Sequence, residues 1–188
     1  NTPGLRSLQS RESLRELLAR IVVARDAAAR GEARPTPVFL KIAPDLLAEE
    51  LAEIAEEVLA AGIEGIIVSN TTLARDGLAS RLAGEAGGMS GRPLFARSTA
   101  VLARMRRLVG PGLTLIGAGG VDSAERALEK VRAGADLVQL YSAMVYGGPG
   151  LPGEIVRGLD RLVAEAGVAH ISELRDSAVD KWAEAEIS

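Results

Sequence analysis

The sequence contains no cysteine and only one histidine, and aromatic residues make up 3% of its 188 residues. The lack of cysteine excludes disulfides, thiolate metal sites and a cysteine nucleophile within the chain. Because His170 has no cluster of carboxylates beside it in the sequence, we expect no metal site. The scarcity of aromatics and the scattered basic residues provide neither a stacking platform nor a basic stripe, so nucleic acid is not an expected partner.

Long apolar runs are also missing, since none approaches the roughly 18 residues of a membrane-spanning helix. The remaining composition is typical of a globular protein, with 47% hydrophobic residues, 25% charged residues and a net charge of -3. A chain of this length can form one domain with a real core, but it is shorter than the roughly 250 residues of a closed eight-stranded barrel. Since the first residue is Asn1 rather than Met, we expect the sequence to be part of a longer protein.

Helix and strand patterns alternate along the chain. Short apolar runs predict strands at residues 38–42, 65–69, 113–117 and 136–141. Helical spacing of apolar residues predicts helices at residues 11–30, 97–109, 123–133 and 153–166, a helix that starts at Pro44-Asp45, and a short helix near Trp182. Residues 72–92 form the longest irregular stretch, and we treat residues 72–90 as a candidate lid. The alternation predicts an α/β fold with parallel strands and right-handed crossovers.

Two architectures fit this alternation, an open doubly wound sheet or half of a (β/α)₈ barrel. A doubly wound sheet normally places its phosphate-binding glycine loop directly after the first strand. Here Lys41-Ile42-Ala43-Pro44 follows the first strand, and the glycine-rich loops follow the later strands. Because barrels bind phosphate after their last strands, this order favours the half barrel.

The glycine cluster at residues 117–120 is a candidate phosphate site. Its glycines let the backbone approach a ligand, and Asp122 with Glu125 resembles a capping box that opens the next helix. A tight turn that needs glycine for its dihedral angles is the simpler alternative. Tyr141-Ser142 adds backbone N–H groups and a hydroxyl at the next strand end, which favours phosphate.

Two further strand ends carry polar side chains. Lys41 ends an apolar strand, where it either extends its charge to solvent or supplies a fixed positive charge to an anionic ring or a carboxylate. Ser69-Asn70-Thr71 either turns the chain or hydrogen-bonds the edges of a planar polar ring.

Six motifs in order resemble one family, the dihydroorotate dehydrogenases. They are Asn1-Thr2-Pro3-Gly4-Leu5-Arg6, Lys41-Ile42-Ala43-Pro44-Asp45-Leu46, Val68-Ser69-Asn70-Thr71-Thr72, Gly87-Gly88-Met89-Ser90-Gly91-Arg92-Pro93-Leu94, Ile116-Gly117-Ala118-Gly119-Gly120 and Leu137-Val138-Gln139-Leu140-Tyr141. The form of the first motif is similar to the quinone-dependent class 2 branch. Ser69 stands where threonine is common in the family, and the hydroxyl is retained.

The resemblance implies that residues 1–188 are the C-terminal portion of a single FMN-binding (β/α)₈ barrel domain, with strands five to eight. By matching motif, the FMN-binding residues would be Lys41, Ser69, Gly91, Gly120, Tyr141 and Ser142. The residues that bind dihydroorotate or orotate would be Asn1, Asn70 and Thr71.

The resemblance also implies the reaction. Dihydroorotate would be oxidised to orotate in pyrimidine biosynthesis, with hydride passing to FMN and electrons to a quinone. The catalytic base would be a serine just upstream of Asn1, so we expect the segment alone to be inactive. An N-terminal region would hold the protein peripherally on the cytoplasmic face of a bacterial inner membrane, or on the mitochondrial inner membrane, although no targeting segment is recognisable in the sequence itself.

Two alternatives stay open. A class 1 dihydroorotate dehydrogenase, or another FMN-binding barrel, would share the lysine and glycine positions, and a cysteine rather than a serine upstream of Asn1 would indicate class 1. The chain would otherwise be a non-catalytic half barrel that serves as an assembly module, with exposed strand edges that need a partner.

Overall fold

A computed structural model describes residue 8, residues 10–29 and residues 35–186 of the chain. Asn1 lies outside these residues, so its expected contact with substrate stays a prediction. The strands are β1 (Phe39–Ile42), β2 (Gly65–Val68), β3 (Thr114–Ala118) and β4 (Leu137–Gln139). The helices are α1 (Arg11–Ala28), α2 (Ala48–Ala61), α3 (Phe95–Val109), α4 (Ala124–Arg132), α5 (Ser142–Gly147), α6 (Leu151–Glu165) and α7 (Val179–Ala183), with short 3-10 turns η2 (Arg92–Leu94) and η3 (Ile171–Glu173).

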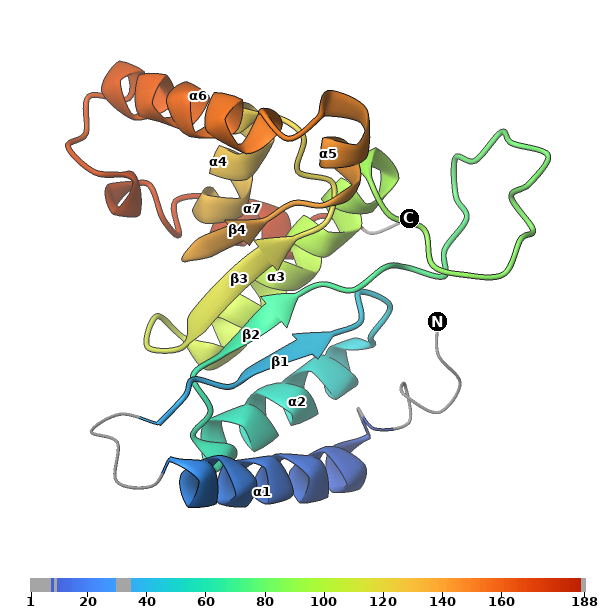
Figure 1. The fold of residues 1–188 in the computed structure, drawn as a ribbon, viewed down its shortest axis with the longest axis vertical. Helices are drawn as coiled ribbons and strands as arrows, with labels where there is room; N and C mark the ends of the chain where they lie inside the picture. Colours follow the sequence, from blue (N-terminus) through green and yellow to red (C-terminus); the bar gives the residue numbers. More distant parts are fainter. Residues whose placement is uncertain (1–7, 9, 30–34, 187–188) are drawn as a thin grey trace.

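The four strands form one parallel sheet in the order β1-β2-β3-β4, so each strand pairs with the next one in the chain. A doubly wound sheet reverses its strand order at one point, whereas a barrel adds strands in sequence. The observed order is therefore that of a barrel segment. The strands point to the same side of the molecule, and the outer helices form an arc around the sheet (Figure 1).

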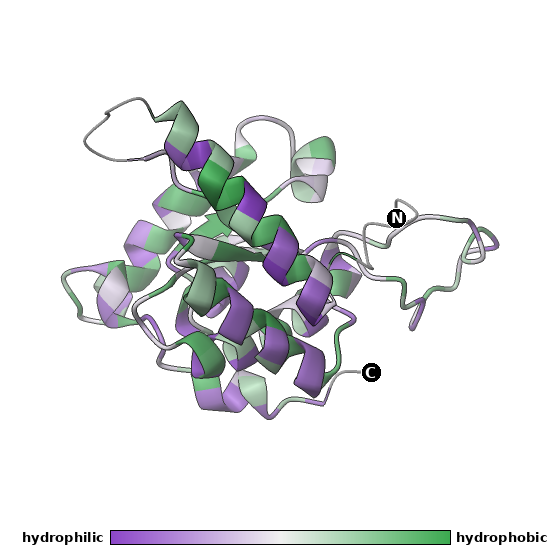
Figure 2. Ribbon diagram, turned by 90° about the horizontal axis from the view of Figure 1, so that it is seen from below, coloured by the Kyte–Doolittle hydropathy of each residue, from purple (hydrophilic) through white to green (hydrophobic). Residues whose placement is uncertain are grey.

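The hydrophobic core lies between the sheet and these helices. Ile42, Ile66 and Leu115 are fully buried on this face and pack with apolar residues of α1, α2 and α3. Alternate positions lie on the opposite face, where Lys41 is exposed and Leu137 is 57% exposed. The helices carry purple and green residues side by side, and the strands between them are largely green (Figure 2). The sheet thus has one face covered by helices and one that is open at its edges.

The predicted strands and most helices are confirmed, with ends that differ by a few residues. The predicted helix start at Pro44-Asp45 is wrong, because α2 begins at Ala48 with Leu47 as its N-cap. Asp45 instead accepts a hydrogen bond from the N–H of Leu73, in the loop that follows β2. The short helix α5 was not predicted from the sequence.

The N-terminal helix α1 is attached to α2 by apolar and ionic contacts. Leu14 and Leu18 of α1 are buried in the core. The carboxylate of Glu57 on α2 accepts hydrogen bonds from Arg11 at 3.0 Å and from Arg15 at 2.7 Å. The hydrogen bond from Arg15, which outweighs the burial of the carboxyl, lowers the pKa of Glu57.

The C-terminal tail folds back over α3 and α4. Trp182 of α7 donates its indole N–H to Glu129 of α4 at 3.0 Å and meets the Phe95 ring edge-on at 5.9 Å. Arg104 of α3 donates to the carbonyls of Ala183 and Ala185. The expected short helix anchored by Trp182 is therefore confirmed. Within the described ranges, no helix is long and apolar enough to cross a membrane.

We expect Leu102→Ala to lower the free energy of unfolding by about 2–5 kcal/mol, because it leaves a cavity where a fully buried side chain packed. The same change at Leu108, on the same helix but 43% exposed, should cost less than about 1 kcal/mol. Urea unfolding of both variants tests this. Equal costs at the two positions would contradict the assignment of this core face.

We expect Glu57→Gln to lower stability at neutral pH, because it removes the ionised partner of Arg15. The native carboxyl has a lowered pKa, so the advantage of the wild type is complete above the ordinary value of 4.5. It should shrink as the pH falls through the lower pKa of the folded protein. Urea midpoints across this pH range provide the measurement, with Glu53→Gln, which has no ion pair among the described residues, as the control.

Candidate active site

Polar residues gather at the carboxyl ends of the four strands, where α5 and the loop of residues 72–91 also emerge (Figure 1). Parallel pairing brings these ends to one edge of the sheet, which is the edge where barrels and other α/β folds bind ligands. Most of the site residues expected from the sequence lie at this edge.

The glycine loop after β3 presses directly on the start of α3. Gly119 and Gly120 have φ angles of 99° and 72°, a region that residues with a side chain rarely adopt. A Cβ atom on Gly120 would lie 2.5 Å from the Cβ of Phe95 and 2.8 Å from its backbone nitrogen. Both the dihedral angle and the close approach therefore require glycine here, as the tight-turn interpretation expected.

Gly91 and Ser142 lie side by side, although they are far apart in the sequence. A Cβ atom on Gly91 would be 3.8 Å from the Cβ of Ser142, and the hydroxyls of Ser142 and Ser90 are 2.9 Å apart. Tyr141 directly precedes α5 and is 82% exposed. Gly91 precedes η2, which runs into Phe95, the residue that Gly120 contacts. The loops after β2, β3 and β4 thus meet at one place.

The start of α4 differs from the capping box expected from the sequence. Ser123, not Asp122, is the N-cap, and its hydroxyl accepts a hydrogen bond from the N–H of Arg126 at 3.3 Å. Asp122 instead pairs with Arg92, and lies 3.5 Å from Arg126. Arg126 also donates to the carbonyl of Gly120 at 3.2 Å. Two guanidinium groups therefore flank the glycine loop, which favours an anionic ligand there.

Lys41 lies on the open face of the sheet. Across the strands it is in register with Ile67, Ile116 and Leu137, so the ammonium group rises from an otherwise aliphatic row. Its side chain forms no ion pair with any residue that the structure describes. A cation in this position is available to a negatively charged ligand above the sheet.

The Ser69-Asn70-Thr71 segment continues β2 beyond its last paired residue. The N–H of Asn70 donates to the carbonyl of Ile42 at 2.8 Å, which fixes the segment beside the end of β1. Ser69 is buried, and its hydroxyl donates to the carbonyl of Asn70. The side-chain oxygen of Asn70 accepts from the N–H of the next residue, Thr71, at 2.9 Å. The exposed Asn70 is therefore held beside Ile42, the residue that follows Lys41 in β1.

Asp45 and Thr72 organise this region but were missed as site residues. The carboxylate of Asp45 accepts hydrogen bonds from the Thr72 hydroxyl and from the N–H of Leu73. Thr72 and Met89 exchange backbone hydrogen bonds of 3.1 and 2.8 Å, which close the base of the 72–91 loop. Pro44-Asp45 matched a helix start so well that the long-range role of Asp45 was not apparent. The lid role of this loop stays a prediction.

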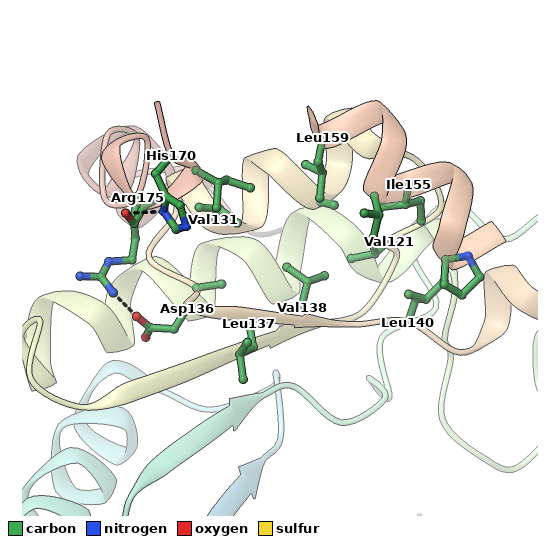
Figure 3. Close-up of a pocket in the computed structure, with 16 residues that line it drawn as sticks. Val121, Val131, Asp136, Leu137, Val138, Leu140, Ile155, Leu159, His170 and Arg175 are labelled. Atoms are coloured by element: carbon green, nitrogen blue, oxygen red, sulfur yellow. Dashed lines mark hydrogen bonds and ion pairs between the residues drawn. The ribbon is translucent and has the colours of Figure 1, made fainter. Parts of the chain in front are cut away.

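A cavity of about 390 Å³ lies away from these residues. It is bounded by β4, α4, α6 and the η3 turn, and its walls are mainly apolar (Figure 3). Val138 and Leu140 line it from the helix-covered face of β4, opposite to the face that carries Leu137 and Lys41. The cavity is therefore separate from the candidate site at the strand ends. Its apolar walls also do not suit a phosphate.

The chain matches one family of known proteins over most of its length. A sequence model of the family described as "Dihydroorotate dehydrogenase" matches residues 1–163. The chain belongs to the dihydroorotate dehydrogenase family. The resemblance inferred from its six motifs is thereby confirmed.

Curated relatives narrow the comparison within this family. A protein of Sinorhizobium fredii named "Dihydroorotate dehydrogenase (quinone)" is 64% identical over 184 residues, 97% of this chain and 51% of its own length. A protein of Rhizobium rhizogenes with the same name is 61% identical over 188 residues, 100% of this chain and 52% of its own length. The chain thus spans about half the length of the curated relatives it matches.

A solved structure supports the barrel assignment. The crystal structure of Eimeria tenella DHODH in complex with ferulenol matches with a TM-score of 0.89 at 32% identity, covering 94% of this chain and 51% of that one. The predicted fold class, an α/β fold that supplies the C-terminal half of a (β/α)₈ barrel, is therefore confirmed.

We expect Gly120→Ala to destabilise the chain by about 1–3 kcal/mol, because alanine is strained at this φ and collides with Phe95. Gly112→Ala is the matched control, since its Cβ atom would meet nothing within 4 Å. Chemical denaturation measures both. A Gly120→Ala variant as stable as the control would contradict the loop geometry described above.

Proposed function

We propose that this chain is the C-terminal half of an enzyme that oxidises dihydroorotate to orotate in pyrimidine biosynthesis, with FMN as cofactor and a quinone as the final electron acceptor. The observation that carries the proposal is the 61–64% identity to relatives named "Dihydroorotate dehydrogenase (quinone)". On this proposal, residues 1–188 form one part of a single FMN-binding barrel domain. The quinone in the names of these relatives favours class 2 over class 1.

The loops after β2, β3 and β4 fit the phosphate group of FMN. Gly120 lets the loop after β3 lie directly against Phe95, Gly91 has no side chain beside Ser142, and Tyr141 and Ser142 add backbone N–H groups and a hydroxyl beside Gly91. Arg92 and Arg126 make the surroundings more positive, although Asp122 is paired with both. A dianionic group surrounded by N–H donors and guanidinium groups is well stabilised.

Lys41 and Ser69 would contact the flavin ring. When bound, FMN supplies the two-electron acceptor for hydride from the substrate and passes electrons on to the quinone. Lys41 would stabilise negative charge on the ring through its ammonium group, which has no ion-pair partner among the described residues. The buried hydroxyl of Ser69 would help to fix the ring edge next to β2.

Asn70, Thr71 and Asn1 would bind the pyrimidine ring of the substrate. The amide of Asn70 both donates and accepts hydrogen bonds, as do the edges of a dihydropyrimidine ring. Its fixed position beside the end of β1 supports this role, because orienting the substrate supplies much of the rate. We expect the base that removes the substrate proton to be a serine that precedes Asn1.

A quinone acceptor implies contact with a membrane that dissolves it. We propose peripheral attachment to the cytoplasmic face of a bacterial inner membrane, through residues outside this chain. The bacterial sources of the relatives favour this over the mitochondrial inner membrane.

The proposal is tested with a fusion that places the N-terminal half of the Sinorhizobium fredii relative ahead of Asn1. We expect the purified fusion to carry FMN and to reduce a quinone analogue when dihydroorotate is added, and this chain alone to show no turnover. A fusion that folds but binds no FMN would refute the proposal and favour the non-catalytic half barrel. Turnover by the chain alone would refute the expectation that a base precedes Asn1.

In the same fusion, we expect Lys41→Met to lower kcat by about 100-fold, because it removes a charge that stabilises the reduced ring. Lys181→Met is the matched control, since Lys181 is an exposed lysine of the C-terminal tail. Steady-state kinetics with a quinone analogue measure both variants. An unchanged kcat in Lys41→Met would count against the assigned role of this residue.

A further inference from the structure

A lysine is buried directly behind the glycine loop, and the proposed function makes no use of it. The side chain of Lys130, on α4, is 0% exposed. Its Nζ donates to the hydroxyl of Ser98 at 2.6 Å and to the carbonyl of Ala118 at 3.3 Å. No carboxylate forms an ion pair with it among the residues that the structure describes. Burial lowers the pKa of Lys130 well below its ordinary value.

A buried amino group without a counter-ion is costly to keep. Moving an ammonium or amine out of water costs free energy that two hydrogen bonds and an aromatic face only partly return. The Phe95 ring lies 5.1 Å from the Nζ and supplies that face. An apolar side chain of similar length would fill the same space without this cost. The presence of lysine at residue 130 is therefore better explained by the hydrogen bonds that its amino group donates than by the packing of its side chain.

The contacts of Lys130 reach two successive carbonyl groups of the glycine loop. One is the carbonyl of Ala118, which accepts from the Nζ directly. The other is the carbonyl of Gly119, which lies 3.2 Å from the Ser98 hydroxyl that Lys130 also contacts. Both carbonyls are thus held from the α3 and α4 side of the loop.

The direction of these carbonyls fixes the direction of the N–H groups that follow them. In a planar trans peptide, the carbonyl of one residue and the N–H of the next point in opposite directions. With the carbonyls of Ala118 and Gly119 turned toward Lys130 and Ser98, the N–H groups of Gly119 and Gly120 point away from the helices. A phosphate at the strand ends needs donors with this orientation.

We infer that Lys130 is a positioning residue for cofactor binding: through Ala118 and Ser98 it orients the N–H groups of Gly119 and Gly120 toward the phosphate of FMN. The inference rests on the proposed function, because it requires a phosphate at this loop. Lys130 itself does not contact the ligand, since it lies fully buried beneath the backbone.

Comparison of FMN with riboflavin, which lacks the phosphate, separates positioning from general stability. In the apo form of the fusion, we expect Lys130→Met to raise the Kd for FMN about tenfold and the Kd for riboflavin less than about threefold, because only FMN uses the oriented N–H groups. Quenching of flavin fluorescence on titration gives both constants. Arg20→Met, which removes an exposed cation of α1, should leave both unchanged.

Two further variants keep the test decisive if Lys130→Met does not fold. Ser98→Ala removes the link to Gly119 but leaves Lys130 in place, so it should weaken FMN binding in the same direction by a smaller factor. Lys130→Gln retains N–H donors and should partly restore the preference for FMN over riboflavin.

The possible outcomes distinguish the two proposals. If the wild-type fusion binds no FMN, the proposed function fails and the inference falls with it. If the wild type binds FMN and the variants keep its ratio of FMN to riboflavin affinity, Lys130 has only a structural role and the inference alone is overturned. A selective loss of FMN affinity in Lys130→Met and Ser98→Ala supports it.

Discussion

Parallel pairing in sequential order is the constraint on which the site depends. Lys41, Asn70, Gly120 and Ser142 come from four separate parts of the chain. Lys41 is the penultimate residue of β1 and the other three follow β2, β3 and β4, and each of these strands is only three to five residues long. Register fixes which side chains share a face and which strand ends lie level. A slip of one residue in β1 would turn Lys41 into the helix-covered core and Ile42 out of it. The core thus enforces the position of the lysine.

Much of this arrangement followed from the sequence because the relevant signals are local. Short apolar runs that end in glycine or small polar residues identify parallel strands, and helical periodicity identifies the segments between them. The order of the glycine loops then favoured a barrel over a doubly wound sheet, and sequential strand pairing agrees. The polar strand ends therefore fell at one edge, as expected.

The features that were missed depend on contacts between distant residues. Asp45 fits a helix start locally, yet its carboxylate binds Thr72 and Leu73 across the strand ends. Asp122 fits a capping position, yet Ser123 caps the helix while Asp122 pairs with Arg92. Lys130 sits in a helix of ordinary pattern, and nothing in its neighbours along the chain indicates that it is buried beneath a loop. Sequence patterns identify elements well, but they do not reveal which polar groups meet between them.

The C-terminal tail has a consequence for how the family is delimited. The family model ends its match at residue 163, whereas the packing behind the glycine loop continues beyond that residue. Trp182 contacts the ring of Phe95, and Phe95 in turn lies directly against Gly120. The packing behind the glycine loop of the candidate site is thus two layers deep, and its second layer comes from residues beyond the stretch that the family model matches. Substitutions in this tail would therefore reach the glycine loop through Phe95 without changing any residue of the candidate site.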